Sequence, residues 1–130
     1  MEILSISIDK EALKKLEEVQ KRLGFKSRSK MLRSAILSML KDYDALEALT
    51  GNAECVFVLT YKDSEKNNVS NILHKFEEII ETEMHHHHSG TCIDILNVST
   101  TANNVRELFS ALKRAKSIYS VTYSIIQKDR

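Results

Sequence analysis

Histidine and cysteine, the side chains that transition metals prefer in proteins, gather in one short stretch of the sequence. Four of the five histidines occupy positions 85–88, directly after Met84, and Cys92, one of the two cysteines, follows them. Imidazole nitrogen and thiolate sulfur together suit borderline and soft ions such as Ni²⁺, Cu²⁺ and Zn²⁺. The stretch therefore predicts a transition-metal site. The alternatives are a purification tag, which normally has six histidines at a terminus, and a tract that scavenges metal without folding around it.

The residues after the histidines predict how this stretch folds. Ser89-Gly90 is flanked by extended, β-compatible residues, which is typical of a two-residue hairpin turn. Across such a turn His87 opposes Cys92, and His85 opposes Asp94. Opposed residues share a face of the sheet, and side chains alternate along each strand. We therefore expect His85, His87 and Cys92 to converge on one face, as three ligands of a site that lacks a fourth.

The first part of the chain predicts one strand and two helices that hold no metal ligand. Residues 3–8 alternate apolar and polar side chains, at the period of a half-buried strand. Asp9 and Ser27 suit the N-caps of two amphipathic helices, and Gly24 suits the end of the first helix. Roughly fifty residues of this kind bury too little surface alone. We therefore expect an intertwined dimer in which the strand pairs with its own copy.

This arrangement resembles the ribbon-helix-helix family of DNA-binding proteins. The resemblance rests on the Ser-Ile-Ser-Ile-Asp strand of residues 5–9, the Gly24-Phe25 turn and the Ser27-Arg28-Ser29 helix start. It implies a two-stranded ribbon that enters the major groove of double-stranded DNA. The side chains expected to face the bases are Ile3, Ser5 and Ser7. The residues expected to bind phosphate at the helix N-terminus are Lys26, Ser27, Arg28 and Ser29. A strand-swapped dimer that binds no DNA is the alternative.

The second part of the chain predicts a different architecture. Thr50-Gly51-Asn52 reads as a helix stop and a short linker, which predicts domains over residues 1–48 and 53–130. A β-rich run over 55–61 is followed by a helix that begins at Ser64 and extends its apolar face to Ile80. The histidine hairpin, another helix and a last strand complete a βαββαβ order, which is the ferredoxin-like pattern. The predicted fold class is α+β: a ribbon-helix-helix followed by a ferredoxin-like, ACT-like domain.

A ribbon-helix-helix domain followed by this second domain resembles the nickel-responsive regulators, the NikR family, over nearly the whole chain. The metal motif of that family is a histidine, ten residues, His-x-His, five residues and a cysteine. Here ten residues separate His74 from His85, and four residues separate His87 from Cys92. By this match one subunit supplies His85, His87 and Cys92, and its neighbour supplies His74. Asp94 falls where the family carries an acidic residue that supports the ligands.

Two features leave alternatives open. A second alignment keeps the family's cysteine spacing and moves the metal-binding pair to Met84 and His86, although it breaks the hairpin pairing. The family also usually has acidic residues at the positions of Lys30 and Ser34, which help a second cation link the two domains. A lysine argues against that second site. We therefore expect weaker coupling between metal and DNA than is usual in the family.

The composition is that of a globular protein. It has 42% hydrophobic and 28% charged residues, and a formal net charge of +1 over 130 residues. This balance excludes a generally basic nucleic-acid-binding chain, so any DNA contact must come from a local patch. No apolar run approaches the roughly 20 residues of a membrane span, and the N-terminus lacks a signal-peptide pattern. We expect no membrane partner and a cytoplasmic protein, in which Cys55 and Cys92 stay reduced.

These features predict a metal-dependent, nickel-responsive transcriptional regulator, specifically a repressor, with Cu²⁺ and Zn²⁺ as the other candidate metals. The expected partners are double-stranded DNA and further copies of the chain. The copies form a dimer through the N-terminal strand and a tetramer through the C-terminal domain. One alternative is a ribbon-helix-helix regulator that senses another metal or a small molecule. Another is a metal-storage or chaperone protein that does not bind DNA. An enzyme is not expected, because no nucleophile–base pair is visible.

Overall fold

The computed structural model describes residues 2–128 of the chain. The helices are α1 (Lys10–Leu23), α2 (Arg28–Glu47), α3 (Lys66–His74) and α4 (Ala102–Arg114), with a 3-10 turn, η1 (Asp63–Glu65), before α3. The strands are β1 (Asn52–Lys62), β2 (Ile80–His88), β3 (Thr91–Thr101) and β4 (Ser120–Lys128). The chain divides into two compact units, Met1–Asp44 and Ala45–Arg130. None of the helices within residues 2–128 has both the length and the apolar composition that crossing a membrane requires.

The helices of the first unit begin and end at the residues that the sequence predicts. The Asp9 carboxylate accepts a hydrogen bond of 2.8 Å from the Ala12 N–H and caps α1. Gly24 ends α1 in the left-handed conformation, with a φ of 74°, which a residue without a Cβ adopts freely. The Ser27 Oγ accepts a hydrogen bond of 3.1 Å from the Lys30 N–H at the start of α2. The three caps therefore set where α1 begins and ends and where α2 begins.

The strand predicted over residues 3–8 does not form in the single chain. Residues 2–9 carry no regular structure and are exposed. A β-strand needs a neighbouring strand for its backbone hydrogen bonds, and one copy of this sequence offers none in the first unit. Among residues 2–44 only Met31 is buried. The exposed large apolar side chains of this unit are Ile3, Leu4, Ile6, Ile8, Leu23, Ile36, Leu37, Met39, Leu40 and Tyr43. One chain thus leaves this unit without a core.

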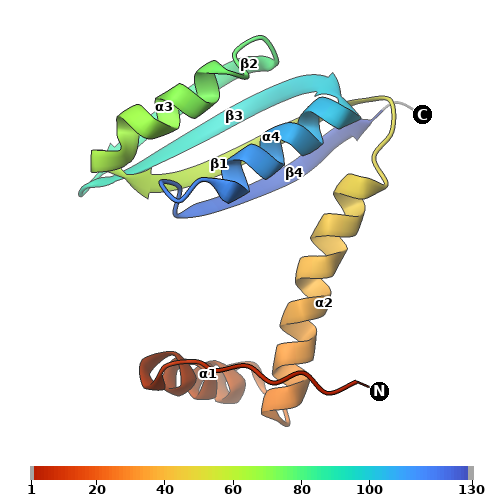
Figure 1. Ribbon diagram of the computed structural model, residues 1–130, viewed down its shortest axis with the longest axis vertical. Coiled ribbons are helices and arrows are strands. Elements are labelled where there is room, and N and C mark those ends of the chain that lie inside the picture. The colour runs from red at the N-terminus through yellow and green to blue at the C-terminus, as the bar shows by residue number, and fades with distance from the viewer. Residues whose placement is uncertain (1, 129–130) are drawn as a thin grey trace. The chain divides into compact units, whose positions relative to one another are not determined.

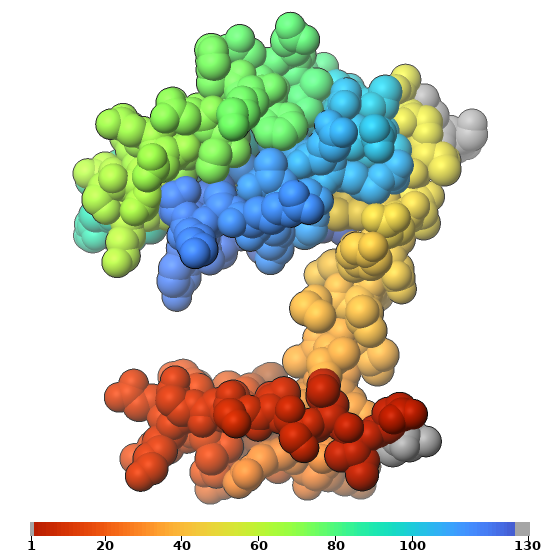
Figure 2. All heavy atoms as spheres, viewed as in Figure 1, coloured from red at the N-terminus to blue at the C-terminus, as the bar shows by residue number. Residues whose placement is uncertain are grey.

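The second unit is an antiparallel four-stranded sheet in the order β2-β3-β1-β4. Helices α3 and α4 lie on the same face of the sheet (Figure 1), and their side chains cover that face in the space-filling view (Figure 2). Alternate residues of β1 and β3 are buried beneath the helices. The largest fully buried apolar side chains are Phe57, Leu59, Leu96, Leu108 and Leu112. This is the predicted βαββαβ fold.

The last residues of α2 and the linker belong to this second core. Leu46 and Leu49 are both 3% exposed and pack in its apolar cluster. The Arg106 guanidinium, on α4, donates hydrogen bonds of 2.9 Å to the carbonyl oxygens of both residues. The Leu46 carbonyl also accepts a hydrogen bond of 3.2 Å from the Leu49 N–H, so Arg106 adds a second donor at the C-terminal end of α2 and ties the linker to α4.

Helix α3 is shorter than the sequence predicts. It begins at Lys66 after η1, so Ser64 is not its cap, and it ends at His74. A series of tight turns follows, and Ile80 then pairs with Val98 in the sheet. The apolar spacing is misleading here because Ile80 faces inward from a strand as readily as it would from a helix.

Candidate metal centre

The β2–β3 hairpin has the register that the sequence predicts. Ser89 and Gly90 both have positive φ, 48° and 79°, as a type I′ turn requires. This turn sets His88 opposite Thr91, and therefore His87 opposite Cys92. Four residues separate His87 from Cys92, one fewer than in the family motif. With a two-residue turn, this spacing still sets the imidazole directly across from the thiol.

The candidate ligands of the hairpin are divided between the two faces of the sheet. His85 and His87 pair with Asp94 and Cys92, both of which are buried on the helix-covered face of the sheet. His86 pairs with Ile93 and Met84 with Ile95, so these side chains lie on the opposite face together with His88. The structure therefore places His85, His87 and Cys92 on one face of the sheet, and it places the alternative pair, Met84 and His86, on the face opposite the cysteine.

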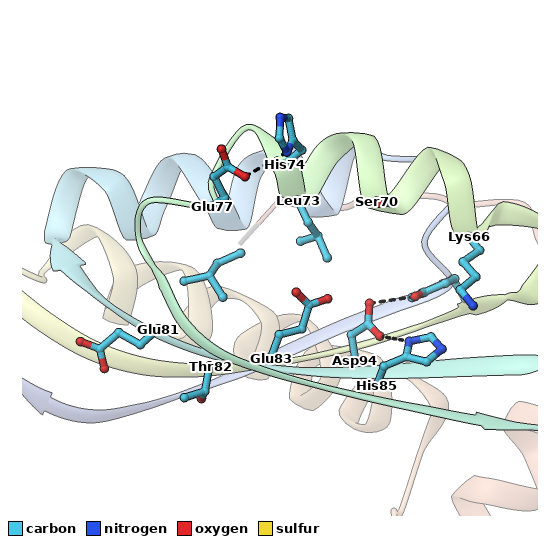
Figure 3. Close-up of a pocket in the computed structure, with 12 residues that line it drawn as sticks. Lys66, Ser70, Leu73, His74, Glu77, Glu81, Thr82, Glu83, His85 and Asp94 are labelled. Atoms are coloured by element: carbon cyan, nitrogen blue, oxygen red, sulfur yellow. Dashed lines mark hydrogen bonds and ion pairs between the residues drawn. The ribbon is translucent and has the colours of Figure 1, made fainter.

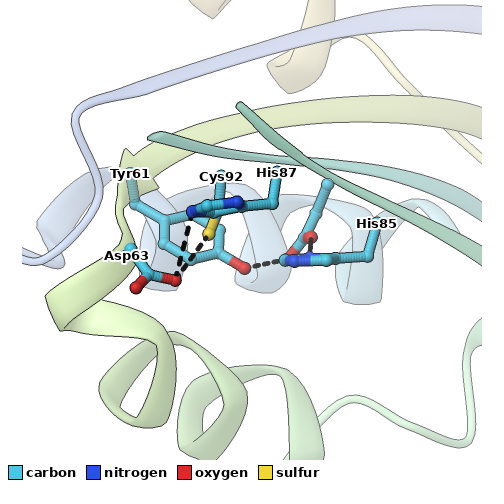
Figure 4. Close-up of polar contacts among 6 residues, drawn as sticks. Tyr61, Asp63, His85, His87 and Cys92 are labelled. Atoms are coloured by element: carbon cyan, nitrogen blue, oxygen red, sulfur yellow. Dashed lines mark hydrogen bonds and ion pairs between the residues drawn. The ribbon is translucent and has the colours of Figure 1, made fainter. Parts of the chain in front are cut away.

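A buried carboxylate orients His85. The His85 Nδ1 lies 2.5 Å from the Asp94 Oδ1, and the Tyr61 hydroxyl donates a hydrogen bond of 2.8 Å to the Asp94 Oδ2 (Figure 4). Burial, followed by the hydrogen bond and charge of Asp94, raises the pKa of Tyr61, so this hydroxyl remains a donor. Asp94 itself is only 2% exposed. A carboxylate that accepts the Nδ1 proton leaves the Nε2 of His85 available to a metal.

A second carboxylate lies beside the other two ligands. The Oδ1 of Asp63, in η1, is 3.6 Å from the His87 Nε2 and accepts a hydrogen bond of 3.7 Å from the Cys92 thiol (Figure 4). Within the described residues, Asp63, His87 and Cys92 are the group whose ligand atoms all lie within 4.8 Å of one another. Asp63 is not among the ligands predicted from the sequence. The predicted fold could have pointed to it, because the end of β1 lies beside the start of β3 and so beside the hairpin.

His74 lies apart from this group. It is at the C-terminal end of α3, where its Nδ1 is 3.0 Å from a Glu77 carboxylate oxygen and its side chain is 77% exposed. A cleft of about 440 Å³ between α3 and β2 is lined by both of these residues and by His85 and Asp94. In Figure 3 the His74 ring points away from the sheet that carries His85. One chain therefore presents three of the four predicted ligands on one face and the fourth elsewhere.

The predicted DNA-contacting side chains are accessible. Ile3, Ser5 and Ser7 are exposed, as are Lys26, Arg28 and Ser29, whereas the capping residue Ser27 is half-buried. The Arg28 Nη2 is paired with a Glu17 carboxylate oxygen at 3.0 Å. An exposed pair of this kind contributes only about 0–1 kcal/mol, so a phosphate can displace Glu17.

Both halves of the chain match known families. Residues 2–43 match the ribbon-helix-helix proteins of the copG family, and residues 55–126 match the NikR C terminal nickel binding domain. The second match alone spans more than half of the chain. The chain belongs to the NikR family. The family consists of transcriptional regulators rather than enzymes, so the expectation that this protein is not an enzyme is confirmed.

Relatives of the NikR chain cover nearly its whole length. A protein of Methanothrix thermoacetophila named as a nickel-responsive regulator is 24% identical over 129 residues, covering 94% of this chain and 92% of the relative. One of Methanothermobacter thermautotrophicus, similarly named, is 25% identical over 122 residues, covering 91% and 87%. These matches support the family assignment along both domains.

Solved structures confirm the fold of the second unit. An uncharacterized protein from Thermotoga maritima superposes with a TM-score of 0.54 at 15% identity, over 59% of this chain and 100% of that one. The ACT domain from the GTP pyrophosphokinase of Chlorobium tepidum does so with a TM-score of 0.50 at 14% identity, over 57% and 100%. At such identities the likeness shows the ACT-like fold alone.

Metal binding at this centre should strengthen as the pH rises. Burial raises the pKa of the Cys92 thiol, and the hydrogen bond to Asp63 and the charges of Asp63 and Asp94 raise it further, against a smaller lowering by Lys66. The thiol is therefore protonated at neutral pH, and a metal must displace its proton. We expect the apparent nickel affinity to increase about tenfold per pH unit above about pH 7. Competition with a chelator at several pH values measures this slope, and a flat profile would exclude Cys92 as a thiolate ligand.

Proposed function

We propose that this chain is a nickel-dependent transcriptional regulator that binds double-stranded DNA through its first unit and nickel through its second. The observation that carries the proposal is the convergence of His85, His87 and Cys92 on one face of a hairpin, within a chain that matches both family domains. We infer a cytoplasmic location from the family to which the chain belongs.

The donor set fits nickel. Two imidazoles and a thiolate stand on paired strands, where the backbone fixes their spacing, and Asp94 orients one of the imidazoles. A third imidazole completes four ligands, and we assign it to His74 of a neighbouring subunit. Nickel bound in this way neutralises the thiolate charge and joins two chains. Copper suits the same donors, so the cell's metal supply also decides which ion is bound.

The assembly we propose is a dimer through residues 2–9 that pairs into a tetramer through the second units. The exposed apolar side chains of the first unit support the dimer, because a strand shared between two chains would cover them. The open face of the sheet supports the second contact. Met84 and Ile95 lie there at 65% and 38% exposure. These two apolar side chains stand directly across from one another, and we assign them to the contact between second units.

Arg28 should set DNA affinity without setting sequence preference. We assign it to a phosphate contact, and phosphate contacts position a protein without reading bases. Arg28→Ala should weaken binding to all duplexes about equally and reduce the salt slope by about one unit. The matched variant Glu17→Gln leaves Arg28 in place and removes its competing carboxylate, so it should bind DNA slightly more tightly. A loss confined to one sequence would show that Arg28 reads bases.

The proposal is tested by selection from a library of random DNA duplexes, carried out with metal-free and with nickel-loaded protein. We expect the nickel-loaded protein to enrich one sequence and the metal-free protein to enrich it weakly or not at all. Ser5 and Ser7 variants should change the enriched sequence, since base contacts determine specificity. Equal enrichment with and without nickel would contradict the proposed function, and it would leave a regulator that does not respond to the metal.

A further inference from the structure

We propose that Asp63 is a metal ligand, and that Asp63, His87 and Cys92 hold a tetrahedral Zn²⁺ within one chain, without His74. The inference rests on the proposed function, because it gives the same hairpin a second occupant. It adds a carboxylate that the His–His–Cys–His set does not contain.

The two distances from Asp63 are close to those of a tetrahedral site, and all three ligand atoms lie within 4.8 Å of one another. The Asp63 Oδ1 is 3.6 Å from the His87 Nε2 and 3.7 Å from the Cys92 Sγ. Bonds of about 2.0–2.3 Å at tetrahedral angles separate neighbouring ligand atoms by about 3.3–3.7 Å. A square-planar ion, whose neighbouring ligands are at right angles, needs them about 2.7–3.0 Å apart. The two Asp63 distances therefore suit an ion that Asp63 binds at tetrahedral angles better than one that it binds in a square plane.

The backbone holds Asp63 in place. β1 ends at Lys62, which pairs with Thr91 at the start of β3. The Asp63 N–H then donates a hydrogen bond of 2.9 Å to the carbonyl oxygen of Gly90, in the hairpin turn. The sheet thus sets the backbone position from which the Asp63 carboxylate reaches the hairpin. A ligand whose backbone is held in this way needs to order only its side chain when it binds an ion.

The charges also suit zinc. A carboxylate and a thiolate together neutralise a divalent cation, and Zn²⁺ accepts oxygen, nitrogen and sulfur ligands alike. The fourth position is left to water or to the nearby His85. Such a site is complete within one chain, so zinc occupies the hairpin without joining two subunits. Asp63 therefore lets the protein bind zinc in a form that does not produce the nickel response.

The test compares Zn²⁺ and Ni²⁺ affinities of the full chain in two variants and a control. Asp63→Asn keeps the shape of an exposed side chain and removes its charge, so it should lower Zn²⁺ affinity about 10- to 100-fold. His74→Ala should lower Ni²⁺ affinity and leave Zn²⁺ affinity within about twofold. The control, Glu65→Gln, lies in the same turn and bonds Asn68 instead of the site, so it should change neither affinity.

Cobalt provides a second readout, because tetrahedral Co²⁺ absorbs visible light strongly. Asp63→Asn should weaken and shift this absorption, whereas Glu65→Gln should not. An Asp63→Asn chain with wild-type Zn²⁺ affinity and cobalt spectrum would overturn the inference. If that chain still bound DNA in a nickel-dependent way, the proposed function would stand. If the wild-type chain showed no nickel-dependent DNA binding, the proposed function would fail whatever the zinc result.

Discussion

Replacing Cys92 by serine should lower the nickel affinity of the chain at least about 100-fold, more than the loss of a residue that only supports a ligand. It should also abolish the thiolate-to-metal charge-transfer absorption. Cys92 is the sulfur donor of the hairpin and stands directly across from His87. A hydroxyl in its place is a poor ligand for a borderline ion. A nickel titration followed by its absorption spectrum measures both effects.

The other cysteine provides the control. Cys55 is also buried, on β1, where it pairs with Val98 and Ile125 far from the hairpin turn. Burial, followed by the charge of Glu54, raises the pKa of its thiol. Cys55→Ala should therefore keep nickel affinity and the charge-transfer band. An unchanged spectrum in Cys92→Ser, or an equal loss in Cys55→Ala, would mean that the hairpin does not hold the metal.

Nickel sites should reappear when two inactive variants are mixed. A His74→Ala chain keeps the hairpin ligands, and a Cys92→Ala chain keeps the histidine of α3. If each metal joins two chains, about one quarter of the sites in a fully exchanged equal mixture have every ligand. Neither variant alone binds nickel at full strength. Calorimetric titration of the mixture, after the subunits have been allowed to exchange, counts the sites.

A matched mixture separates sharing from general rescue. His85 and Cys92 stand on the same hairpin, so a His85→Ala chain mixed with a Cys92→Ala chain cannot form a complete site. We expect no recovery there. Recovery in both mixtures, or in neither, would be inconsistent with His74 being supplied by a neighbouring subunit.

The features that sequence predicted well are those fixed by near neighbours in the chain. Asp9, Gly24 and Ser27 each act within one helical turn, and the structure has all three caps. Ser89-Gly90 set the hairpin register because a two-residue turn allows one pairing. From that register alone, the pairing of His85 with Asp94 followed.

The features that sequence missed depend on groups distant in the chain or absent from it. Asp63 and Cys92 are 29 residues apart in the sequence. They meet only because β1 pairs with β3. The strand of residues 3–8 needs a second copy to form. Helix α3 ends at His74, and Ile80 joins the sheet instead of the helix, a tertiary contact that local apolar spacing does not reveal.

Metal and DNA binding must affect each other equally if nickel controls this protein. A coupling of about 1–3 kcal/mol tightens DNA binding roughly 5- to 150-fold, and DNA then raises nickel affinity by the same factor. The family usually has two acidic residues that help a second cation link the domains. Here Lys30 and Ser34, both exposed on α2, stand at those positions, so we expect a coupling in the lower part of this range.

The most direct measurement is therefore a pair of nickel titrations of the full chain, one without DNA and one with a saturating amount of the duplex enriched by the nickel-loaded protein. We predict that the duplex raises nickel affinity at least about fivefold, and that it raises the affinity of the Cys92→Ser chain not at all. Identical nickel affinities with and without the duplex would contradict nickel-dependent DNA binding by this protein.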